Sequence, residues 1–552
     1  MIRQGEQLIF SASDLINFMG CAHATFLDIR NLAAPIAFPP DDEAAVLLQD
    51  KGLEHERTYY TRLCSERRTS IEIPGDIPLA ERVELTRKAM RDGVDVIYQG
   101  AFRDGCWHGY ADFLLRVEER RSKLGDYAYE VADTKLARTA KPKHLLQLCV
   151  YADLLAREQE TAPERLHVVL GDGSIASIRF SGVVHYFNVA RARFEAYAES
   201  PPAASAGNPC GHCTFCRWAA TCEADWDANN HLSLVAGMSR TQAEAMRAVG
   251  ITSLLELSNV AADARVPGIQ PAALERLAAQ ARLQAHQRAT GERRTEVLSV
   301  SPNRGFARLP KPDAGDIFFD MEGDPLFEGG LEYLFGLVVT EAGKERFVPF
   351  WAHDREEEKQ AFQNTVDFIT ARLAEHADAH IYHYASYEES ALKRLAMYHG
   401  TREAEVDDLL RGEKLVDLYK VVREAIRTSE PRYSIKNMEA FYLEGGRTGD
   451  VKTAGDSIVI YERWRRLGDA KLLSGIAEYN EFDCHSTRLC RDWLISLRPA
   501  GSSWKEKPEP KVTDQAKIEE RRESEEKTAQ VTAALLDGIV DDWHWHSIEP
   551  MR

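Results

Sequence analysis

The chain has 552 residues, of which 44% are hydrophobic and 28% are charged, and these fractions exclude a chain that is disordered throughout. Its 69 Lys and Arg against 87 Asp and Glu give a net charge of −18, which argues against a protein that simply coats nucleic acid. The length predicts several domains, while the lack of long apolar runs and of a secretory signal predicts a cytoplasmic protein without membrane contact.

The first 230 residues mix helix and strand signals and predict an α/β domain. Ser11 precedes a stretch typical of a capped helix, and a Pro-rich loop over 200–209 leads into a group of cysteines. Further elements are expected in this order: a long helix over 41–67, two strands of a hairpin over 109–117 and 127–135, and a helix over 141–158.

The expected hairpin carries a pattern typical of metal-dependent phosphodiester chemistry. Residues two apart on a strand share a face, so Asp133 and Lys135 project together, and Asp112 can join them from the preceding strand. Two carboxylates can hold a divalent cation, and a lysine can stabilise a phosphate in its transition state. An Asp-x-Lys strand alone also fits a surface ion pair, but Gln147 and Tyr151 lie four apart on the next helix and add a shared face.

With His55 on an early helix, this arrangement resembles the RecB-type branch of the PD-(D/E)xK nuclease superfamily. The resemblance implies a Mg²⁺ or Mn²⁺ site and the following roles: His55, Asp112 and Asp133 as metal ligands, Lys135 as the catalytic lysine, and Gln147 and Tyr151 as residues that support the site and contact DNA. Ala111 stands where most members have proline.

Four cysteines, Cys210, Cys213, Cys216 and Cys222, fall within thirteen residues. An intracellular chain seldom keeps such a group for disulfides, so a bound metal or an iron–sulfur cluster is expected. Cys210 could complete a local set of four ligands. The order of cysteines and nuclease motifs resembles that of AddB-type nucleases, which implies a [4Fe–4S] cluster on Cys21, Cys213, Cys216 and Cys222, with Zn²⁺ as the alternative.

Residues 231–295 predict short helices with Gly-containing turns. The turns resemble helix-hairpin-helix units, which contact DNA phosphates, and a plain helical spacer fits equally well. Residues 296–314 are expected to be a linker, and Arg293, Arg294 and Arg304 are candidates for a basic groove.

A second acidic pattern begins with Asp320 and Glu322, two apart on a strongly apolar strand where unpaired charges are costly. Tyr479 and Asp483 lie far downstream on one helical face. The pattern resembles the tyrosine-containing DEDD exonucleases of the RNase H-like fold. That resemblance implies catalytic Asp320, Glu322, Glu388, Tyr479 and Asp483, with Asp320, Glu322 and Asp483 as metal ligands. Glu388 stands where the family has aspartate, and His383 where it often has asparagine.

Over residues 1–498 the chain resembles the bacterial RecB-like nuclease family with a C-terminal RNase H-like, YprB-type domain. This implies a PD-(D/E)xK core, a helical spacer, an RNase H-like α/β domain over 315–498 and a charged tail over 499–552. We expect a metal-dependent DNA nuclease that acts on single strands or ends in repair, recombination or defence. A nucleic-acid-binding scaffold with degenerate sites, or an RNase, are the alternatives. No phosphate-loop motif is present, so we expect any helicase to be a separate chain, or this protein to be a shortened form.

Overall fold

The structure is a computed structural model. It describes residues 1–5, 7–40, 42–66, 69–447, 451, 453–506, 522–524, 526–528, 530–531 and 533–534. Met1–Lys505 form one compact unit and Glu506–Arg552 a second. Most of the expected charged tail lies outside the described residues. Among the described helices, none combines the length and the apolar character that crossing a membrane requires.

The N-terminal part is built on a six-stranded sheet with the strands in sequence order. The strands are β3 (Ser70–Glu72), β4 (Val96–Asp104), β5 (Trp107–Val117), β6 (Ala128–Thr134), β7 (Arg165–Val169) and β8 (Ile175–Arg179). Strands β4, β5 and β6 are antiparallel neighbours, so the expected hairpin is present, and β6 runs parallel to β7.

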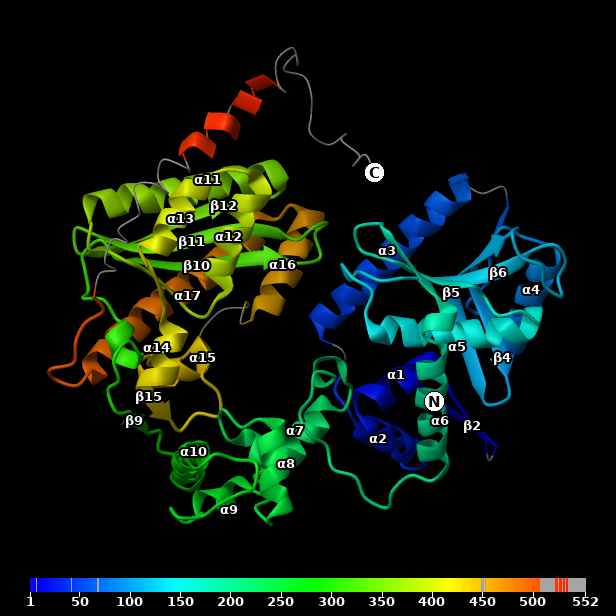
Figure 1. Cartoon of the computed structure of the whole chain (residues 1–552), viewed down its shortest axis with the longest axis horizontal. Helices are drawn as coiled ribbons and strands as arrows, with labels where there is room; N and C mark the ends of the chain where they lie inside the picture. The colour runs from blue at the N-terminus through cyan, green and yellow to red at the C-terminus, as the bar shows by residue number, and fades with distance from the viewer. Residues whose placement is uncertain are drawn as a thin grey trace. The chain divides into compact units, whose positions relative to one another are not determined.

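Helices cover both faces of this sheet (Figure 1). They are α1 (Ala12–Gly20), α2 (Ala22–Ala33), α3 (Glu43–Glu66), α4 (Leu79–Arg91), α5 (Pro142–Gln159) and α6 (Val184–Glu199), and a small hairpin, β1 (Ile2–Gln4) and β2 (Gln7–Ile9), precedes them. The side chains of α5 pack with Val131 and Leu166 on one face, whereas Tyr59 and Leu63 of α3 pack with Phe113 on the other. The expected helices after Ser11, over 41–67 and over 141–158 correspond to α1, α3 and α5.

A helical segment follows the cysteines. Its elements are a 3-10 turn at Cys213–Phe215, α7 (Ala219–Ala228), a 3-10 turn at Leu232–Leu234, α8 (Arg240–Ala248), α9 (Leu254–Ser258) and α10 (Pro271–Thr290). Ser239 and Ser253 each accept a backbone hydrogen bond at the start of a helix, and glycines with φ of 85° and 81°, Gly250 and Gly268, make the turns.

The expected linker over 296–314 contains regular structure. It holds the end of β9 (Thr295–Val297) and a 3-10 turn at Gly305–Arg308. Strand β9 pairs antiparallel with β15 (Ile426–Thr428), and Leu298 N–H donates to the Ala425 carbonyl at 2.8 Å. The segment is therefore ordered because its backbone groups find partners in a distant part of the chain.

The C-terminal part is built on a five-stranded sheet in the order β12-β11-β10-β13-β14. The strands are β10 (Ile317–Asp324), β11 (Leu331–Glu341), β12 (Lys344–Trp351), β13 (Ile381–His383) and β14 (Leu415–Asp417). Strands β10, β11 and β12 are antiparallel neighbours, and β13 and β14 run parallel to β10. The helices are α11 (Arg355–Glu375), α12 (Tyr387–His399), α13 (Glu403–Arg411), α14 (Leu418–Ala425), α15 (Ile435–Met438), α16 (Ala454–Leu467) and α17 (Ala470–Leu497), with a 3-10 turn at Glu439–Phe441.

Alternation along β10 decides which residues face which helix. Ile317, Phe319 and Met321 pack in one cluster with α11 and α12, whereas Phe318 packs in another cluster with α17. Figure 1 shows α11 and α17 on opposite faces of the sheet. Because side chains alternate with a period of two, Asp320 and Glu322 lie on the same face as Phe318, toward α17.

Candidate functional site

Three carboxylates converge between β10 and α17. The oxygen atoms that Asp320, Glu322 and Asp483 offer lie within 4.8 Å of one another, although Asp483 is more than 150 residues downstream. Glu322 and Asp483 are 5% and 9% exposed. When the His, Cys, Asp and Glu side chains of the described residues are compared, these three carboxylates lie close enough together to hold one metal ion.

Neighbouring polar groups hold these carboxylates in place. Asn480 Nδ2 donates to Asp320 Oδ2 at 2.7 Å, and Arg447 Nη2 donates to Asp483 Oδ1 at 2.5 Å. Gly336 of β11 lies opposite Asp320 and makes room for the amide, because a Cβ at that position would lie 1.6 Å from Asn480 Oδ1.

The electrostatics of the cluster favour a bound cation. Burial raises the pKa of Asp320 well above its usual value, and the charges of Asp483, Glu322 and Glu388 raise it further. Burial and the charge of Asp483 also raise the pKa of Glu322 to about 8. Burial raises the pKa of Asp483 although Arg447 opposes the shift. Carboxylates that repel one another in a buried site fit a divalent cation, which compensates their charge and accepts oxygen ligands.

Glu388 lies beside this group on the first turn of α12. Its carboxylate contributes to the raised pKa of Asp320 and stands 3.3 Å from Nδ1 of His383, at the end of β13. Both side chains are buried, and neither ring nitrogen of His383 has a hydrogen-bond partner among the described residues. The Glu388 carboxylate is thus near the cluster but outside its 4.8 Å spacing.

Tyr479 lies one helical turn before Asp483 and shares the cavity with the acidic group. The cavity has a volume of about 620 Å³, and Asp320, Glu322, Glu388, Tyr479 and Asp483 line it with Arg138 and Arg394 among others. The ammonium of Lys436 lies 5.8 Å from the Tyr479 ring centroid. Burial and the neighbouring carboxylates raise the pKa of Tyr479, so its hydroxyl keeps its proton at neutral pH.

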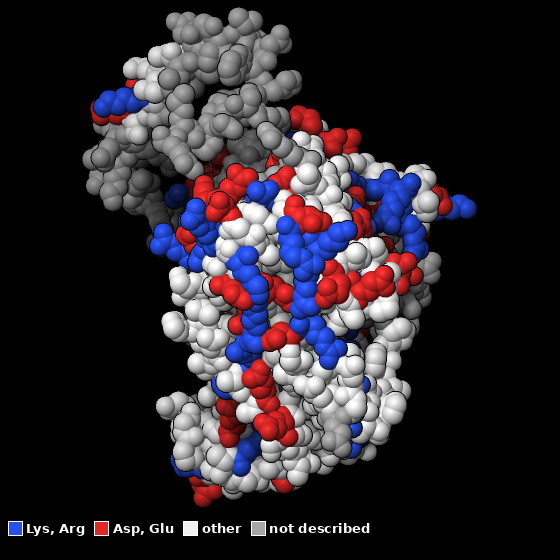
Figure 2. All heavy atoms as spheres, turned by 90° about the vertical axis from the view of Figure 1, so that its right-hand side faces the viewer, with Lys and Arg blue, Asp and Glu red and all other residues white. Residues whose placement is uncertain are grey.

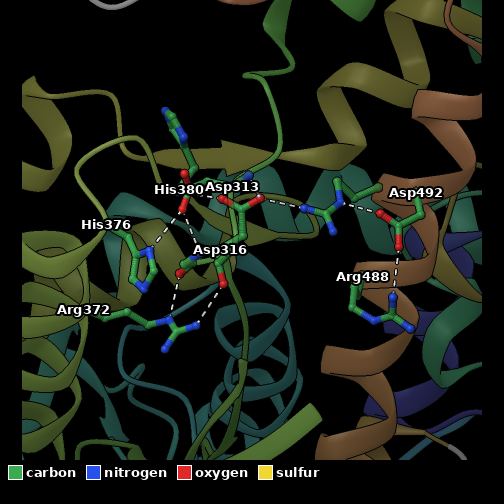
Figure 3. A network of polar contacts seen from close by, with 10 residues as sticks. Asp313, Asp316, Arg372, His376, His380, Arg488 and Asp492 are labelled. Atoms are coloured by element: carbon green, nitrogen blue, oxygen red, sulfur yellow. Dashed lines mark hydrogen bonds and ion pairs between the residues drawn. The ribbon is translucent and has the colours of Figure 1, made fainter. Parts of the chain in front are cut away.

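A buried ion pair ties α17 to the start of β10. Arg491 Nη1 donates to Asp316 Oδ2 at 2.6 Å, and Asp316 also accepts from the backbone N–H groups of Asp313 and His380 at 3.0 Å each. Figure 3 shows the surrounding polar network, in which His376 approaches Asp313. Because α17 carries Asp483 and β10 carries two carboxylates, this pair sets how the two elements meet.

Residues 317–495 match the model of the RNase_H superfamily. The chain therefore carries an RNase H-like domain, which suggests a nuclease that hydrolyses phosphodiester bonds with divalent metal ions. No curated protein matches the chain.

The residues of the first predicted site also meet in space. Lys135, just after β6, forms an ion pair with Asp133, which is fully buried. Gln147 Nε2 donates to Asp133 Oδ1 at 3.1 Å and to the Tyr151 hydroxyl at 3.2 Å. Gly109 of β5 admits Tyr151, since a Cβ there would lie 2.7 Å from its ring.

Asp112 approaches Asp133 from β5. Burial raises the pKa of Asp112 well above its usual value, and the charges of Asp133 and Glu56 add to the shift. Burial disfavours the Lys135 ammonium, but Asp133 and Asp112 outweigh this effect and raise the pKa of Lys135. The chemistry at neutral pH is therefore that of a charged lysine beside a carboxyl pair.

Gln99 and Glu56 also belong to this site, although the sequence assigned neither of them a role there. Gln99 has a φ of 57° and leaves the β4–β5 ladder unpaired opposite Asp112, without a shift of register. Its amide donates to the Glu56 carboxylate at 2.5 Å. His55 Nε2 is buried without a hydrogen-bond partner among the described residues, which suits a metal ligand. The ligand atoms of His55, Asp112 and Asp133 do not all lie within 4.8 Å of one another.

The cysteines gather around the junction of α1 and α2. Cys21, Cys216 and Cys222 pack against one small core that contains Trp218. Cys210 Sγ lies 3.9 Å from Cys213 Sγ. Burial raises the pKa of Cys222 to about 11, and the neighbouring thiols, Cys21 among them, add to the shift.

The distances between these thiols can be compared with those that a single zinc ion or an iron–sulfur cluster requires. One tetrahedral Zn²⁺ holds its sulfur ligands about 3.8 Å apart. Among the described residues no set of three or more cysteine Sγ atoms meets the 4.8 Å spacing that the acidic cluster meets. An iron–sulfur cluster is larger than one ion and separates its thiolates more widely, so a set of thiols outside this spacing is compatible with it.

The arginines proposed for a basic groove are paired with acids. Arg293 pairs with Glu430, Arg294 with Glu292 and Arg304 with Glu424, at 2.9, 2.8 and 3.6 Å. Figure 2 likewise shows Lys and Arg interspersed with Asp and Glu over the face in view. The charge of these three arginines is therefore partly neutralised within the chain.

Proposed function

We propose that the chain is a metal-dependent nuclease that hydrolyses phosphodiester bonds in DNA, on single strands or at ends, in repair, recombination or defence. The observation that carries the proposal is the convergence of Asp320, Glu322 and Asp483 within one cavity of an RNase H-like domain. Mg²⁺ or Mn²⁺ bound there supplies positive charge to the scissile phosphate and to the attacking water.

In this proposal the chain's own residues hold the reacting groups. Asn480 fixes one oxygen of Asp320, so the carboxylate is oriented before substrate enters. Tyr479 keeps its hydroxyl proton and orients the attacking water from the cavity wall. Arg447 pairs with Asp483 and so compensates the charge of one carboxylate of the cluster; a cation held by the three carboxylates would compensate the same charge. Glu388 serves as the fourth acid, one methylene longer than the usual aspartate.

The N-terminal part is proposed as a second nuclease domain of the PD-(D/E)xK type. Its domain covers residues 1–230, followed by a helical spacer (231–295), a connecting segment (296–314) and the RNase H-like domain (315–498). Lys135 stabilises the phosphate in the transition state, and His55, Asp112 and Asp133 hold Mg²⁺ or Mn²⁺. The short contacts between Lys135, Asp133 and Gln147 support this assignment.

The cysteines are proposed to bind a [4Fe–4S] cluster through Cys21, Cys213, Cys216 and Cys222, with Zn²⁺ as the alternative. Such a group connects α1 and α2 to the loop after α6, so its role is to stabilise the N-terminal domain. The proposal predicts a brown protein with broad absorbance near about 400 nm after anaerobic purification, whereas a colourless protein with one zinc per chain contradicts it.

The test is a nuclease assay on end-labelled single- and double-stranded DNA and RNA with Mg²⁺ or Mn²⁺. We expect Lys135→Ala and Asp320→Ala each to remove part of the cleavage and the double variant to remove all of it. Asp367→Ala, an exposed aspartate of α11, is the matched control and keeps full activity. If both single variants cleave like the parent, the two site assignments fail.

A binding scaffold is the second candidate. The observation that favours it is the ion pair of Arg447 with Asp483, which occupies an oxygen that a metal ion needs. Metal-independent binding of DNA without hydrolysis by the parent chain decides for this candidate. Cleavage of RNA alone in the substrate panel assigns the RNase H-like domain to RNA instead.

A further inference from the structure

The segment that connects Lys135 to α5 is strongly basic. Its residues 136–143 read Leu-Ala-Arg-Thr-Ala-Lys-Pro-Lys and carry Arg138, Lys141 and Lys143, all exposed. Arg138 lines the cavity of the acidic cluster. Within the described part of the chain, Lys141 and Lys143 take part in no ion pair, unlike Lys135, which pairs with Asp133. Their charge is therefore available to a ligand.

An exposed aromatic side chain stands next to this segment. Phe215 is 69% exposed on the 3-10 turn Cys213–Phe215, and Lys143 Nζ lies 5.1 Å from its ring centroid. Leaving a phenylalanine exposed gives up about 1.5–3 kcal/mol of burial free energy, so the ring does not serve the core. The turn is anchored because Cys216 packs against the Trp218 core. The ring is thus a fixed, solvent-facing platform with an ammonium beside it.

The buried His144 lies in the positive potential at this place. Burial lowers the pKa of His144, and the charges of Lys135 and Lys143 lower it further, to about 4. The same Lys143 ammonium lies over the Phe215 ring, so the basic segment and the cysteine turn form one surface.

We propose that Lys141, Lys143 and Phe215 form a binding surface for single-stranded nucleic acid beside the Asp112–Asp133–Lys135 site. The lysines neutralise phosphates of the backbone, and Phe215 stacks on one base. An unpaired base is required because the faces of paired bases are already stacked in a duplex. The assignment to nucleic acid rests on the proposed nuclease function, and it narrows the substrate of that site to single strands or frayed ends.

The test is the equilibrium binding of a labelled 20-nucleotide dT strand to the full chain in EDTA, measured by fluorescence anisotropy. Phe215→Leu is expected to weaken binding about 5- to 100-fold, the effect of losing one stacked base, and Phe215→Trp to restore it. Removal of both lysines (Lys141→Ala with Lys143→Ala) should lower the slope of log affinity against log salt by about 1.4. Tyr186→Leu, the matched change of another exposed aromatic ring, on α6, should leave affinity unchanged.

An abasic strand of the same length separates stacking from charge. Phe215→Leu should not affect its binding, whereas the lysine variant should. Equal binding of the dT strand by parent and Phe215→Leu, or equal losses for both strands, overturns the stacking role. If Phe215→Leu disturbs the cysteine turn, the salt slope of the lysine variant decides, and an unchanged slope overturns the proposal. Because EDTA prevents hydrolysis, this assay measures binding independently of cleavage. If the chain binds the strand in this way but does not cleave it with Mg²⁺ or Mn²⁺, the nuclease function is refuted and the binding surface is not.

Discussion

Replacing Glu322 by glutamine should stabilise the metal-free protein at alkaline pH and remove much of its pH dependence. The pKa of Glu322 rises from 4.5 to about 8, because burial and the charge of Asp483 both disfavour ionisation. An acid with a higher pKa in the folded state binds its proton more tightly there. The contribution of Glu322 to the free energy of unfolding is therefore greatest below about pH 4.5 and is lost as the pH rises through about 8.

The magnitude follows from the same numbers. A rise from 4.5 to about 8 makes the ionised form about 5 kcal/mol less favourable in the folded chain than in the unfolded chain. Glutamine carries no charge, so Glu322→Gln removes this destabilisation and also reduces the repulsion on Asp320. Mn²⁺ at 100 times its dissociation constant should stabilise the parent by about 2.7 kcal/mol and the variant by less.

The assay is urea denaturation with EDTA between about pH 5 and pH 9, combined with hydrogen exchange of the β10 amides. Glu356→Gln, an exposed glutamate of α11, is the matched control and should follow the parent. If the stability profiles of the parent and Glu322→Gln superimpose across this range, the carboxylates do not repel one another as the geometry implies.

Three further changes test other parts of the structure. Gly336→Ala, introduced into the Lys135→Ala background so that only the RNase H-like cluster is assayed, should lower cleavage roughly 10- to 100-fold in single-turnover assays, because the new methyl group displaces the Asn480 amide that orients Asp320; unchanged cleavage would show that this amide does not contribute to catalysis. Arg491→Met should lower the free energy of unfolding by about 3–5 kcal/mol, since it leaves the buried Asp316 carboxylate unpaired, and adding Asp316→Asn should recover most of the loss in denaturant titrations. If the two substitutions instead lower the free energy of unfolding additively, Arg491 and Asp316 are not coupled. Cys216→Ser should reduce bound iron or zinc in elemental analysis, whereas Cys64→Ser, an exposed thiol, should not.

The local pattern of the chain was enough to place several side chains. Alternation on β10 predicted that Asp320 and Glu322 share a face, and the same rule predicted the meeting of Asp133 with Lys135. These residues depend only on the geometry of one strand, which the sequence determines locally. The approach of Asp483 to β10 came from the resemblance to a family, since no local rule joins residues so far apart.

The supporting contacts were not predictable in this way. Gly336 and Asn480 matter because one gives space to the other, which requires knowing that β11 and α17 both contact β10. Gln99 stands opposite Asp112 in the β4–β5 ladder, and this position depends on the register of the two strands. The strand β9 within the expected linker forms only because β15, more than 100 residues later, supplies its partners. Each case depends on a distant partner.

Catalysis by the RNase H-like cluster is tested most directly by cleavage of a labelled single strand by Lys135→Ala, in which this cluster is the remaining nuclease site. We expect that this variant still releases nucleotides with Mn²⁺ and that adding Asp320→Ala abolishes the release, while both proteins keep the same circular dichroism spectrum. Persistent cleavage by the double variant, or none by Lys135→Ala alone, would contradict the assignment of catalysis to Asp320, Glu322 and Asp483.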